Sequence, residues 1–343
     1  MDLTNFYSFG LGIGTKNKKG QWLEVFYPVP VFKPMGDDVS KIAEVLGYKG
    51  GNESIDLTDK LIGDLASIVT DSRQQQILGM MRMSTSPRVA CMLQTDAALT
   101  STPEAYLKLH LLSHRQVLPN AQNLDGIFAQ LPNVAWTDAG AIDLEELPDE
   151  QLKARAQGRL LEVSSVDKFP KMTNYVAPYG VRIAHSARVR LGAYLGEGTT
   201  VMHEGFVNFN AGAIGPNMIE GRLSQGVIMD SGSDLGGGAS TQGTLSGGGE
   251  IVLTIGKDCL LGANAGTGIA LGDRCTIESG LYITAGTAVQ VLDENKSFVK
   301  VAKARDLSGQ NDMLFIRNSQ TGIVECRTNK KAIQLNDSLH SNN

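Results

Sequence analysis

A six-residue repeat of aliphatic side chains occupies the stretch from about Val181 to Val289. This spacing matches neither the period of a helix nor the alternation of an ordinary strand. Several of the aliphatic residues are followed at once by glycine, as in Leu195-Gly196 and Leu261-Gly262. The repeat positions are Val189, Leu195, Val201 and Val207, then Ile255 and Leu261, and, after a change of register, Leu271, Ile277, Ile283 and Val289.

A unit of six residues can supply one short strand and one tight corner, so three units can close a triangular coil. The aliphatic side chain then points into the prism, and Gly, Asn and Ser serve the corners. Coils stack about 4.8 Å apart, so this region gives roughly six coils. A β-sandwich is the alternative, but its turns should recur about every 8 to 12 residues. We therefore predict a parallel β-solenoid.

The bulk properties exclude several classes of protein. The 343-residue chain carries 31 Lys plus Arg against 36 Asp plus Glu, a net charge of -5, which does not indicate a nucleic-acid or anionic-membrane partner. The N-terminal stretch lacks the regions of a signal peptide, and no apolar run approaches a membrane span, so we expect a cytoplasmic protein. The four cysteines form no CxxC pair, which argues against a zinc knuckle or a disulfide scaffold. We expect Cys259 and Cys275 to fill the solenoid core.

Composition divides the chain into three parts. We expect an N-terminal α/β domain over residues 1–167, the solenoid over 168–290, and a C-terminal segment and tail over 291–343. Proline and glycine punctuation just before the repeats supports the first boundary. A strand at 313–316 is expected in the last part. Because an open solenoid end exposes unpaired strand groups, the flanking parts should act as caps.

The N-terminal part shows several elements. Residues 6–33 read as a β-hairpin with an aromatic-rich first strand. Thr58 is placed to cap a helix, and a second helix should begin at Thr102-Pro103. The acidic segment 143–150 is expected to be a solvated surface before a short helix over 151–161.

His110 and His114 lie one helical turn apart, a spacing that could hold a metal ion. A histidine pair without a third ligand nearby is more often a structural or solvated feature. We therefore favour the structural interpretation.

The hexads are interrupted twice, at 203–226 and at 231–250, by segments rich in glycine and polar residues. Segments that leave a rigid solenoid are candidate binding loops. The first contains His203-Glu204 and Glu220-Gly221-Arg222. The second contains two glycine triplets, which would let a ligand approach bare backbone.

The motifs HEGFVNFNAG, IEGR, GSDLGGGAS, TLSGGG and LLGANAG, in this order, are similar to those of tetrahydrodipicolinate N-succinyltransferase of the longer type found in pseudomonads and actinobacteria. The match covers roughly Tyr179 to Ser319 and includes KARDLSG and RNS. The resemblance implies a mainly β protein: a left-handed parallel β-helix with an N-terminal α/β domain and a short C-terminal β cap. It also implies a homotrimer that transfers succinyl from succinyl-CoA to the amine of ring-opened tetrahydrodipicolinate, in the diaminopimelate route to lysine.

A thioester is already activated, so such an enzyme must mainly position it, help the amine lose a proton and stabilise the oxyanion. By the resemblance, Glu220 is the catalytic carboxylate, acting either as a nucleophile that forms a succinyl anhydride or as a base. An ion pair of Glu220 with Arg222 is the structural alternative. Arg222 could instead bind the terminal carboxylate of succinate and so select succinyl over acetyl.

The resemblance also assigns residues to the remainder of succinyl-CoA. Those along the acyl and pantetheine groove would be Gly237, Ser240, Ala263, Glu278, Ser279 and Gly286. Those toward the nucleotide would be Lys303, Ile316, Arg317, Asn318 and Ser319. A lysine and an arginine there would suit the phosphates, and a solvated tail is the alternative.

Some family members hold Mg²⁺ near the trimer axis through a carboxylate that matches Glu204 and an Asp in the preceding coil. Here Ala187 stands at the position of that Asp. One carboxylate per subunit around a threefold axis could still bind a hard cation, though more weakly. A metal at Glu204 and a plain buried or water-linked Glu204 both stay open.

Three other functions compete. The first is a related transferase that uses acetyl-CoA or another amine. The second is a γ-class carbonic anhydrase, which needs histidines around zinc, whereas only His185 and His203 lie in the repeat region. The third is a non-enzymatic scaffold or ice-binding surface, which would show a regular outer face rather than irregular polar interruptions.

Overall fold

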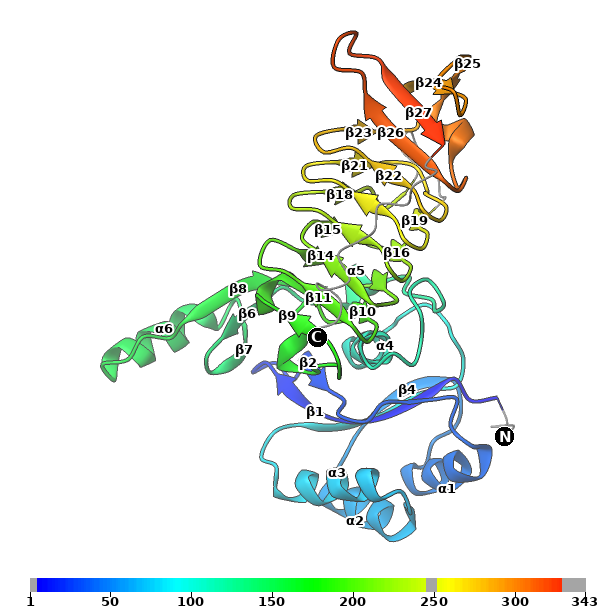
Figure 1. Ribbon diagram of the computed structural model, residues 1–343. Helices are drawn as coiled ribbons and strands as arrows, with labels where there is room; N and C mark the ends of the chain where they lie inside the picture. The colour runs from blue at the N-terminus through cyan, green and yellow to red at the C-terminus, as the bar shows by residue number, and fades with distance from the viewer. Residues whose placement is uncertain (1–4, 245–251, 329–343) are drawn as a thin grey trace. The chain divides into compact units, whose positions relative to one another are not determined.

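The computed structural model describes residues 5–244 and 252–328 (Figure 1). The chain forms two compact units. The first comprises Met1–Val117, Ala121–Pro170 and Asn174–Val176, and the second comprises Leu118–Asn120, Lys171–Thr173 and Ala177–Asn343. Across the described ranges, no helix has the length and apolarity needed to cross a membrane.

An antiparallel sheet forms the centre of the first unit, with strand order β2-β1-β5-β4 and β3 also paired to β1. The hairpin predicted over residues 6–33 is confirmed, because β1 and β2 pair antiparallel across the turn. The strands are β1 (Ser8–Lys16), β2 (Trp22–Phe26), β3 (Val31–Phe32), β4 (Asn52–Asp56) and β5 (Arg88–Leu93).

Four helices accompany this sheet. The Thr58 Oγ1 accepts a hydrogen bond from the Leu61 N–H, which confirms the predicted cap. The helix predicted to begin at Thr102 is also confirmed. The sequence did not indicate the other two, which bury residues such as Val39 and Leu78 against the core. The helices are α1 (Gly36–Leu46), α2 (Asp59–Ile68), α3 (Ser72–Met83) and α4 (Thr102–Ser113).

His110 on α4 is fully buried and makes two hydrogen bonds. Its Nδ1 lies 2.7 Å from the Tyr106 carbonyl oxygen, and its Nε2 accepts from the Tyr27 N–H at 3.3 Å. This pattern fixes a neutral tautomer. Burial lowers the pKa of His110 to about 3 and that of His114 to about 4. The structural interpretation of the pair is therefore confirmed.

A second, three-stranded sheet of order β7-β6-β8 completes the first unit. The helix expected over 151–161 runs instead over Leu147–Ala156, so the acidic segment 143–150 is not only a surface loop. Pro148 and the acidic residues after it suit a helix N-terminus, which explains the earlier start. The elements are α5 (Ile127–Gln130), β6 (Val134–Thr137), β7 (Gly140–Asp143), α6 (Leu147–Ala156) and β8 (Val163–Asp167).

The second unit is a parallel solenoid with three faces (Figure 1). The chain visits three parallel sheets in turn, so each circuit adds one short strand to each face. Sheet 1 contains β9 (Arg182–Ile183), β11 (Thr199–Val201), β14 (Asn217–Ile219), β17 (Asp234–Leu235), β20 (Leu260–Leu261) and β22 (Thr276–Ile277). Sheet 2 contains β12 (Phe206–Val207), β15 (Arg222–Leu223), β18 (Ser240–Thr241), β21 (Gly266–Thr267) and β23 (Tyr282–Ile283). Sheet 3 contains β10 (Tyr194–Leu195), β13 (Gly212–Ala213), β16 (Ile228–Met229) and β19 (Thr254–Ile255).

The predicted inward positions are all buried, with at most 2% of each residue exposed. This holds for Val189, Leu195, Val201, Val207, Ile255, Leu261, Leu271, Ile277, Ile283 and Val289. Cys259 and Cys275 are also fully buried in the solenoid, as expected. The hexad interpretation is therefore confirmed.

The prediction that residues 203–226 leave the solenoid is wrong. They continue it through β12, β13, β14 and β15, with Ala213, Ile219 and Leu223 pointing inward. Leu223 follows Ile219 by only four positions, and this shorter interval breaks the apparent hexad.

The segment 231–250 also stays in the coils as far as β18. Thr241 takes an inward position there, where its hydroxyl accepts from the Ser224 N–H and donates to the Arg222 carbonyl oxygen. The second glycine triplet, at 247–249, lies outside the described residues.

The C-terminal segment extends sheet 1. Its third strand pairs in parallel with β22, and the strand predicted at 313–316 is thereby confirmed. It covers the end of sheet 1 that β22 would otherwise expose. The strands are β24 (Ala288–Leu292), β25 (Phe298–Lys303), β26 (Met313–Arg317) and β27 (Val324–Thr328).

Candidate functional site

The register of sheet 1 brings most of the predicted site residues into one column. Ile219, Leu235, Leu261, Ile277 and Phe315 occupy equivalent positions in successive strands. The residues that follow them therefore stack at the corner where the chain leaves sheet 1. We call this column the sheet 1 corner, and it contains Glu220, Gly237, Ala263, Glu278, Ser279 and Ile316–Ser319.

Backbone hydrogen bonds tie the sheet 1 corner together from coil to coil. The Gly238 N–H donates to the Glu220 carbonyl oxygen at 3.3 Å. The Asn264 N–H donates to Gly237 and the Gly280 N–H to Ala263, both at 2.8 Å. Residues almost 100 positions apart in the sequence are thus held in a fixed row.

The Glu220 carboxylate lies beside Gly237. A Cβ atom added to Gly237 would lie 3.6 Å from the Glu220 Oε2, an ordinary contact. Its neighbours are constrained by the backbone instead, because a Cβ on Gly236 would lie 2.7 Å from the Ala263 nitrogen. Gly238 has a φ of 70°, and a Cβ there would lie 2.5 Å from the Asn264 Oδ1. Of these three glycines, only Gly237 could carry a Cβ atom without a backbone clash or strain. Its missing side chain leaves space beside the Glu220 carboxylate.

We expect Gly237→Val to lower transfer activity by more than tenfold while leaving the thermal unfolding midpoint within about 2 °C of wild type, since a Cβ at this position meets only the Glu220 carboxylate. Gly238→Val is the matched comparison and should lower the midpoint clearly, because its positive φ is strained for a β-branched residue. Differential scanning fluorimetry and initial rates measure both. Full activity in Gly237→Val would contradict this role.

Arg222 and Ser240 are neighbours on the outer face of sheet 2. The Arg222 guanidinium donates to the Ser240 Oγ from Nε at 3.2 Å and from Nη2 at 2.7 Å. Among the residues that the structure describes, no ion pair joins Arg222 to Glu220. The alternative interpretation of Glu220 as an ion-pair partner of Arg222 is therefore wrong. Ser240 holds an exposed guanidinium whose remaining donors can meet an anionic group.

Gly286 and Lys303 lie at a different corner, the one that follows sheet 2. The Ala304 N–H donates to the Thr287 carbonyl oxygen at 2.9 Å, and the Arg305 N–H donates to that of Ala285 at 3.1 Å. The segments of Gly286 and Lys303 are therefore adjacent. The predicted site residues thus form two rows on either side of sheet 2, with Arg222 and Ser240 on the face between them.

Tyr282 is a residue of this face that the sequence interpretation missed. It continues the outward row of Arg222, Ser240 and Gly266. A Cβ on Gly266 would lie 2.2 Å from the Tyr282 ring, so the half-exposed ring lies directly on that glycine. An outward glycine one coil before an aromatic residue is the signal that could have identified it.

Glu278 has a structural task at the upper end of the sheet 1 corner. Its Oε2 accepts a hydrogen bond from the Arg317 N–H at 2.7 Å. The Asn318 side chain donates to the Glu325 Oε1, and the Arg317 Nη1 donates to the Gly322 carbonyl oxygen. The segment Ile316–Ser319 is therefore part of an ordered hairpin, not a solvated tail.

Glu204 lies in the coil before Glu220, and its side chain is exposed rather than buried. Its Oε1 is 2.9 Å from the His203 Nδ1, and its Oε2 accepts from the Arg188 Nη2 at 3.3 Å. These hydrogen-bond and charge interactions, His203 first and Arg188 next, lower the pKa of the Glu204 carboxyl.

These surroundings do not fit Mg²⁺, which requires several oxygen ligands around it. Both Glu204 oxygens already face nitrogen donors, and Ala187 supplies no ligand. Within residues 5–244 and 252–328, no three His, Cys, Asp or Glu side chains are grouped so that they could hold a metal ion.

Comparisons with known proteins agree with one another. A family model described as tetrahydrodipicolinate N-succinyltransferase middle matches residues 131–171, and one described as hexapeptide repeat of succinyl-transferase matches residues 252–285. The chain is 61% identical over 341 residues, covering 99% of each chain, to the 2,3,4,5-tetrahydropyridine-2,6-dicarboxylate N-succinyltransferase of Pseudomonas aeruginosa. It is 51% identical over 341 residues to the Vibrio cholerae protein of the same name, covering 98% of this chain and 99% of that one. A crystal structure from Campylobacter jejuni, of a candidate 2,3,4,5-tetrahydropyridine-2-carboxylate N-succinyltransferase, superposes with a TM-score of 0.89 at 31% identity, covering 96% of this chain and 94% of that one.

Proposed function

The chain belongs to the tetrahydrodipicolinate N-succinyltransferases, and from this premise we propose how its solenoid performs the transfer. The reaction moves the succinyl group of succinyl-CoA to the amine of ring-opened tetrahydrodipicolinate, giving N-succinyl-2-amino-6-oxopimelate and CoA. The observation that carries the site assignment is the sheet 1 corner, which places the Glu220 carboxylate beside the open backbone of Gly237.

Glu220 supplies the reactive carboxylate. As a base, it takes a proton from the amine while the nitrogen attacks the thioester carbonyl. The C–S bond then breaks, and the CoA thiolate leaves and is protonated. As a nucleophile, it attacks the thioester itself, releases CoA and forms an anhydride that the amine then opens. Intact-protein mass spectrometry after mixing with succinyl-CoA alone separates the two routes, because only the second adds a succinyl group to the protein.

Arg222 recognises the terminal carboxylate of the succinyl group. Its guanidinium is exposed and is oriented by two hydrogen bonds to Ser240, so little side-chain entropy is lost when an anion binds. A planar carboxylate can accept two parallel hydrogen bonds from a guanidinium, and acetyl offers no such group. This contact would therefore select succinyl-CoA over acetyl-CoA.

CoA would lie along sheet 2, between the sheet 1 corner and the corner that contains Gly286 and Lys303. Backbone groups at Ala263, Ser279 and Gly286 suit the pantetheine amides. Lys303 and Arg317 provide cations for the phosphates. A left-handed coil and a homotrimer are part of this proposal and rest on the family resemblance. Mass photometry tests the trimer. No step is assigned to Mg²⁺, because the groups around Glu204 do not fit it.

The test of the function is thiol release from succinyl-CoA with and without tetrahydrodipicolinate. Acceptor-dependent release supports the reaction. Release that is equally fast with acetyl-CoA would indicate the rival acetyl transferase, and no release with either donor would overturn the transferase assignment.

We expect Arg222→Met to raise the KM for succinyl-CoA and to narrow the ratio of kcat/KM values between succinyl-CoA and acetyl-CoA by at least tenfold, since a charge-assisted bond contributes about 1.5 to 3 kcal/mol. Arg182→Met is a matched control, because Arg182 is also an exposed residue at a solenoid strand. An unchanged ratio in Arg222→Met would remove this residue from acyl selection.

A further inference from the structure

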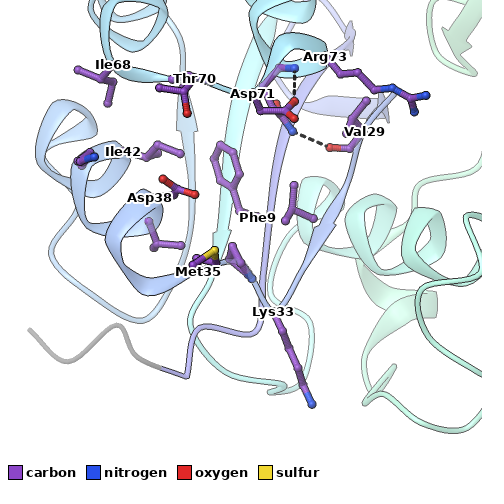
Figure 2. A pocket seen from close by; sticks show the side chains of 16 residues that line it. Phe9, Val29, Lys33, Met35, Asp38, Ile42, Ile68, Thr70, Asp71 and Arg73 are labelled. Carbon is purple, nitrogen blue, oxygen red and sulfur yellow. Dashed lines mark hydrogen bonds between the residues drawn. The ribbon is translucent and has the colours of Figure 1, made fainter.

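A cavity of about 400 Å³ lies in the first unit, among α1, the end of α2, the start of α3 and strands β1 and β3 (Figure 2). Its lining is mainly apolar but includes charged residues. Figure 2 shows Asp38 beside Ile42, whereas Arg73 and Lys33 extend away from it in two other directions. Because these charges do not converge on one point, the cavity is assigned no ligand. Polar groups converge instead on the outer face of sheet 2.

The outward row of sheet 2 crosses successive coils on one face of the solenoid. Its members pair in register from coil to coil, and Arg222 is the only charged residue among them. Neighbouring strands lie about 4.8 Å apart, so Arg222 and Tyr282, three coils apart, are separated by about 14 Å along the face. The row consists of Phe206, Arg222, Ser240, Gly266 and Tyr282.

The side chains of Arg222 and Tyr282 extend toward each other along this row. The guanidinium reaches the next coil, where its Nε and Nη2 donate to the Ser240 Oγ at 3.2 and 2.7 Å. The tyrosine ring reaches one coil in the opposite direction, because a Cβ atom on Gly266 would lie 2.2 Å from its Cε2 and 2.7 Å from its Cζ. The phenol oxygen is bonded to Cζ and therefore lies near Gly266. One coil spacing, about 4.8 Å, remains between the guanidinium and the hydroxyl.

The fold leaves donors on both sides of this space. Arg222 is exposed, and its Nη1 has no partner among the residues that the structure describes. Tyr282 is 41% exposed, and within the same described ranges its hydroxyl makes no hydrogen bond. One acceptor group placed between them would meet both donors.

A carboxylate suits this space better than the neutral groups of an acyl-CoA. It offers about four acceptor sites, so it can take hydrogen bonds from two sides at once. Its negative charge also matches the guanidinium, whereas a thioester or amide oxygen would leave that charge unpaired. Within the succinyl group, the terminal carboxylate is the only group of this kind.

We propose that Tyr282 determines donor specificity together with Arg222. Its hydroxyl donates a hydrogen bond to the terminal carboxylate of succinyl-CoA from the side opposite the guanidinium. This role rests on the proposed function, which assigns that carboxylate to Arg222. Gly266 is part of the device, because its missing side chain lets the ring lie against the sheet. A site built from donors on two sides rejects an acyl group that lacks the acceptor.

The experiment compares succinyl-CoA with butyryl-CoA, whose acyl group has the same number of carbons but ends in a methyl group. Isothermal titration calorimetry on the full-length protein without tetrahydrodipicolinate gives the Kd of each. Tyr282→Phe removes only the hydroxyl and keeps the ring on Gly266. We expect it to lower the preference for succinyl-CoA at least tenfold, while the Kd of butyryl-CoA stays within about twofold. An unchanged preference would overturn the proposal. Equal weakening of both donors would also overturn it, because the hydroxyl would then contact pantetheine.

Tyr194→Phe is the matched control. Tyr194 also precedes an inward leucine and lies in register with a glycine of the next coil, Gly212, but it belongs to sheet 3. This variant should leave the preference for succinyl-CoA unchanged. An equal loss in both variants would contradict a specific contact at Tyr282.

Two further variants test the geometry. Gly266→Ala should reproduce the loss although the hydroxyl is retained, because the added Cβ displaces the ring; circular dichroism checks its fold. In an Arg222→Met background, Tyr282→Phe should change the preference less than threefold, since the two residues act on one carboxylate. A full tenfold effect in that background would contradict a shared ligand group.

Turnover separates this proposal from the proposed function. Absence of thiol release by the wild-type protein would overturn the function, whereas the ratio of the two Kd values would still decide the role of Tyr282. A raised KM for tetrahydrodipicolinate in Tyr282→Phe, with an unchanged donor preference, would assign the hydroxyl to a carboxylate of the acceptor and overturn the proposal.

Discussion

Replacing Glu220 with glutamine is expected to lower kcat/KM for succinyl transfer by about 10² to 10⁴-fold, the usual contribution of a positioned proton-transfer group. Glutamine keeps the size of the side chain and the hydrogen bond from the Glu220 N–H to the Leu235 carbonyl oxygen. It removes only the carboxylate that would take the proton or attack the thioester. The loss should therefore appear in kcat, with little change in the KM for succinyl-CoA.

Steady-state rates with saturating tetrahydrodipicolinate measure this effect. Glu197→Gln is the control, because Glu197 is also a glutamate in a solenoid turn, although it is exposed where Glu220 is half-buried, and it follows β10 at another corner. It should stay within about twofold of wild type, a difference too small for a lost catalytic group. If Glu220→Gln retained wild-type turnover in a folded protein, the chemistry would have to be assigned to another group.

Replacing Lys108 with methionine is expected to destabilise the first unit by about 2 to 3 kcal/mol, because it removes a buried ammonium and leaves three acceptors without their donor, while the Asp96 carboxylate, 30% exposed, stays partly solvated. The Lys108 side chain is completely buried. Its Nζ donates to the Asp96 Oδ1 at 2.5 Å and to the carbonyl oxygens of Ala97 and Asn123 at 2.8 and 2.6 Å. Methionine fills the volume but satisfies none of these three acceptors.

Urea unfolding followed by tryptophan fluorescence measures this loss, since both tryptophans, Trp22 and Trp136, lie in the first unit. Lys19→Met is the matched control. The Lys19 ion pair with Glu145 has the same 2.5 Å distance but is largely exposed, so its loss should leave the urea midpoint almost unchanged. Equal shifts for the two variants would contradict the dependence on burial.

The residue types and their spacing were sufficient to predict those elements that depend on interactions between residues close in the sequence. The six-residue period identified ten inward positions that are all buried. The cap at Thr58 and the helix start at Thr102 followed from the bonding needs of a helix start, although the residue that caps the second helix is Ser101. The helix α3 escaped notice because its apolar residues follow no clear stripe, and tertiary packing of Ile77 and Met81 decides it.

A fixed six-residue spacing did not predict the inward positions where the number of residues per coil changes. Leu235 follows Ile219 by 16 positions, but Leu261 follows Leu235 by 26, although both pairs are stacked neighbours. The shortened turn before Leu223 made residues 203–226 look like a loop. The family resemblance identified Glu220 and Gly237 as separate site residues. Only the register of the coils shows that they lie next to each other in one row.

The sequence by itself determined that the chain forms a solenoid and which side chains fill it, because burial follows the local period of apolar residues. The tertiary structure decided which outward residues meet, since that depends on the length of every intervening turn. It pairs Arg222 with Ser240 rather than Glu220, and it engages Glu204 with Arg188 and His203. It also forms the cavity beside Asp38 from three helices and a sheet, whose proximity no local pattern encodes.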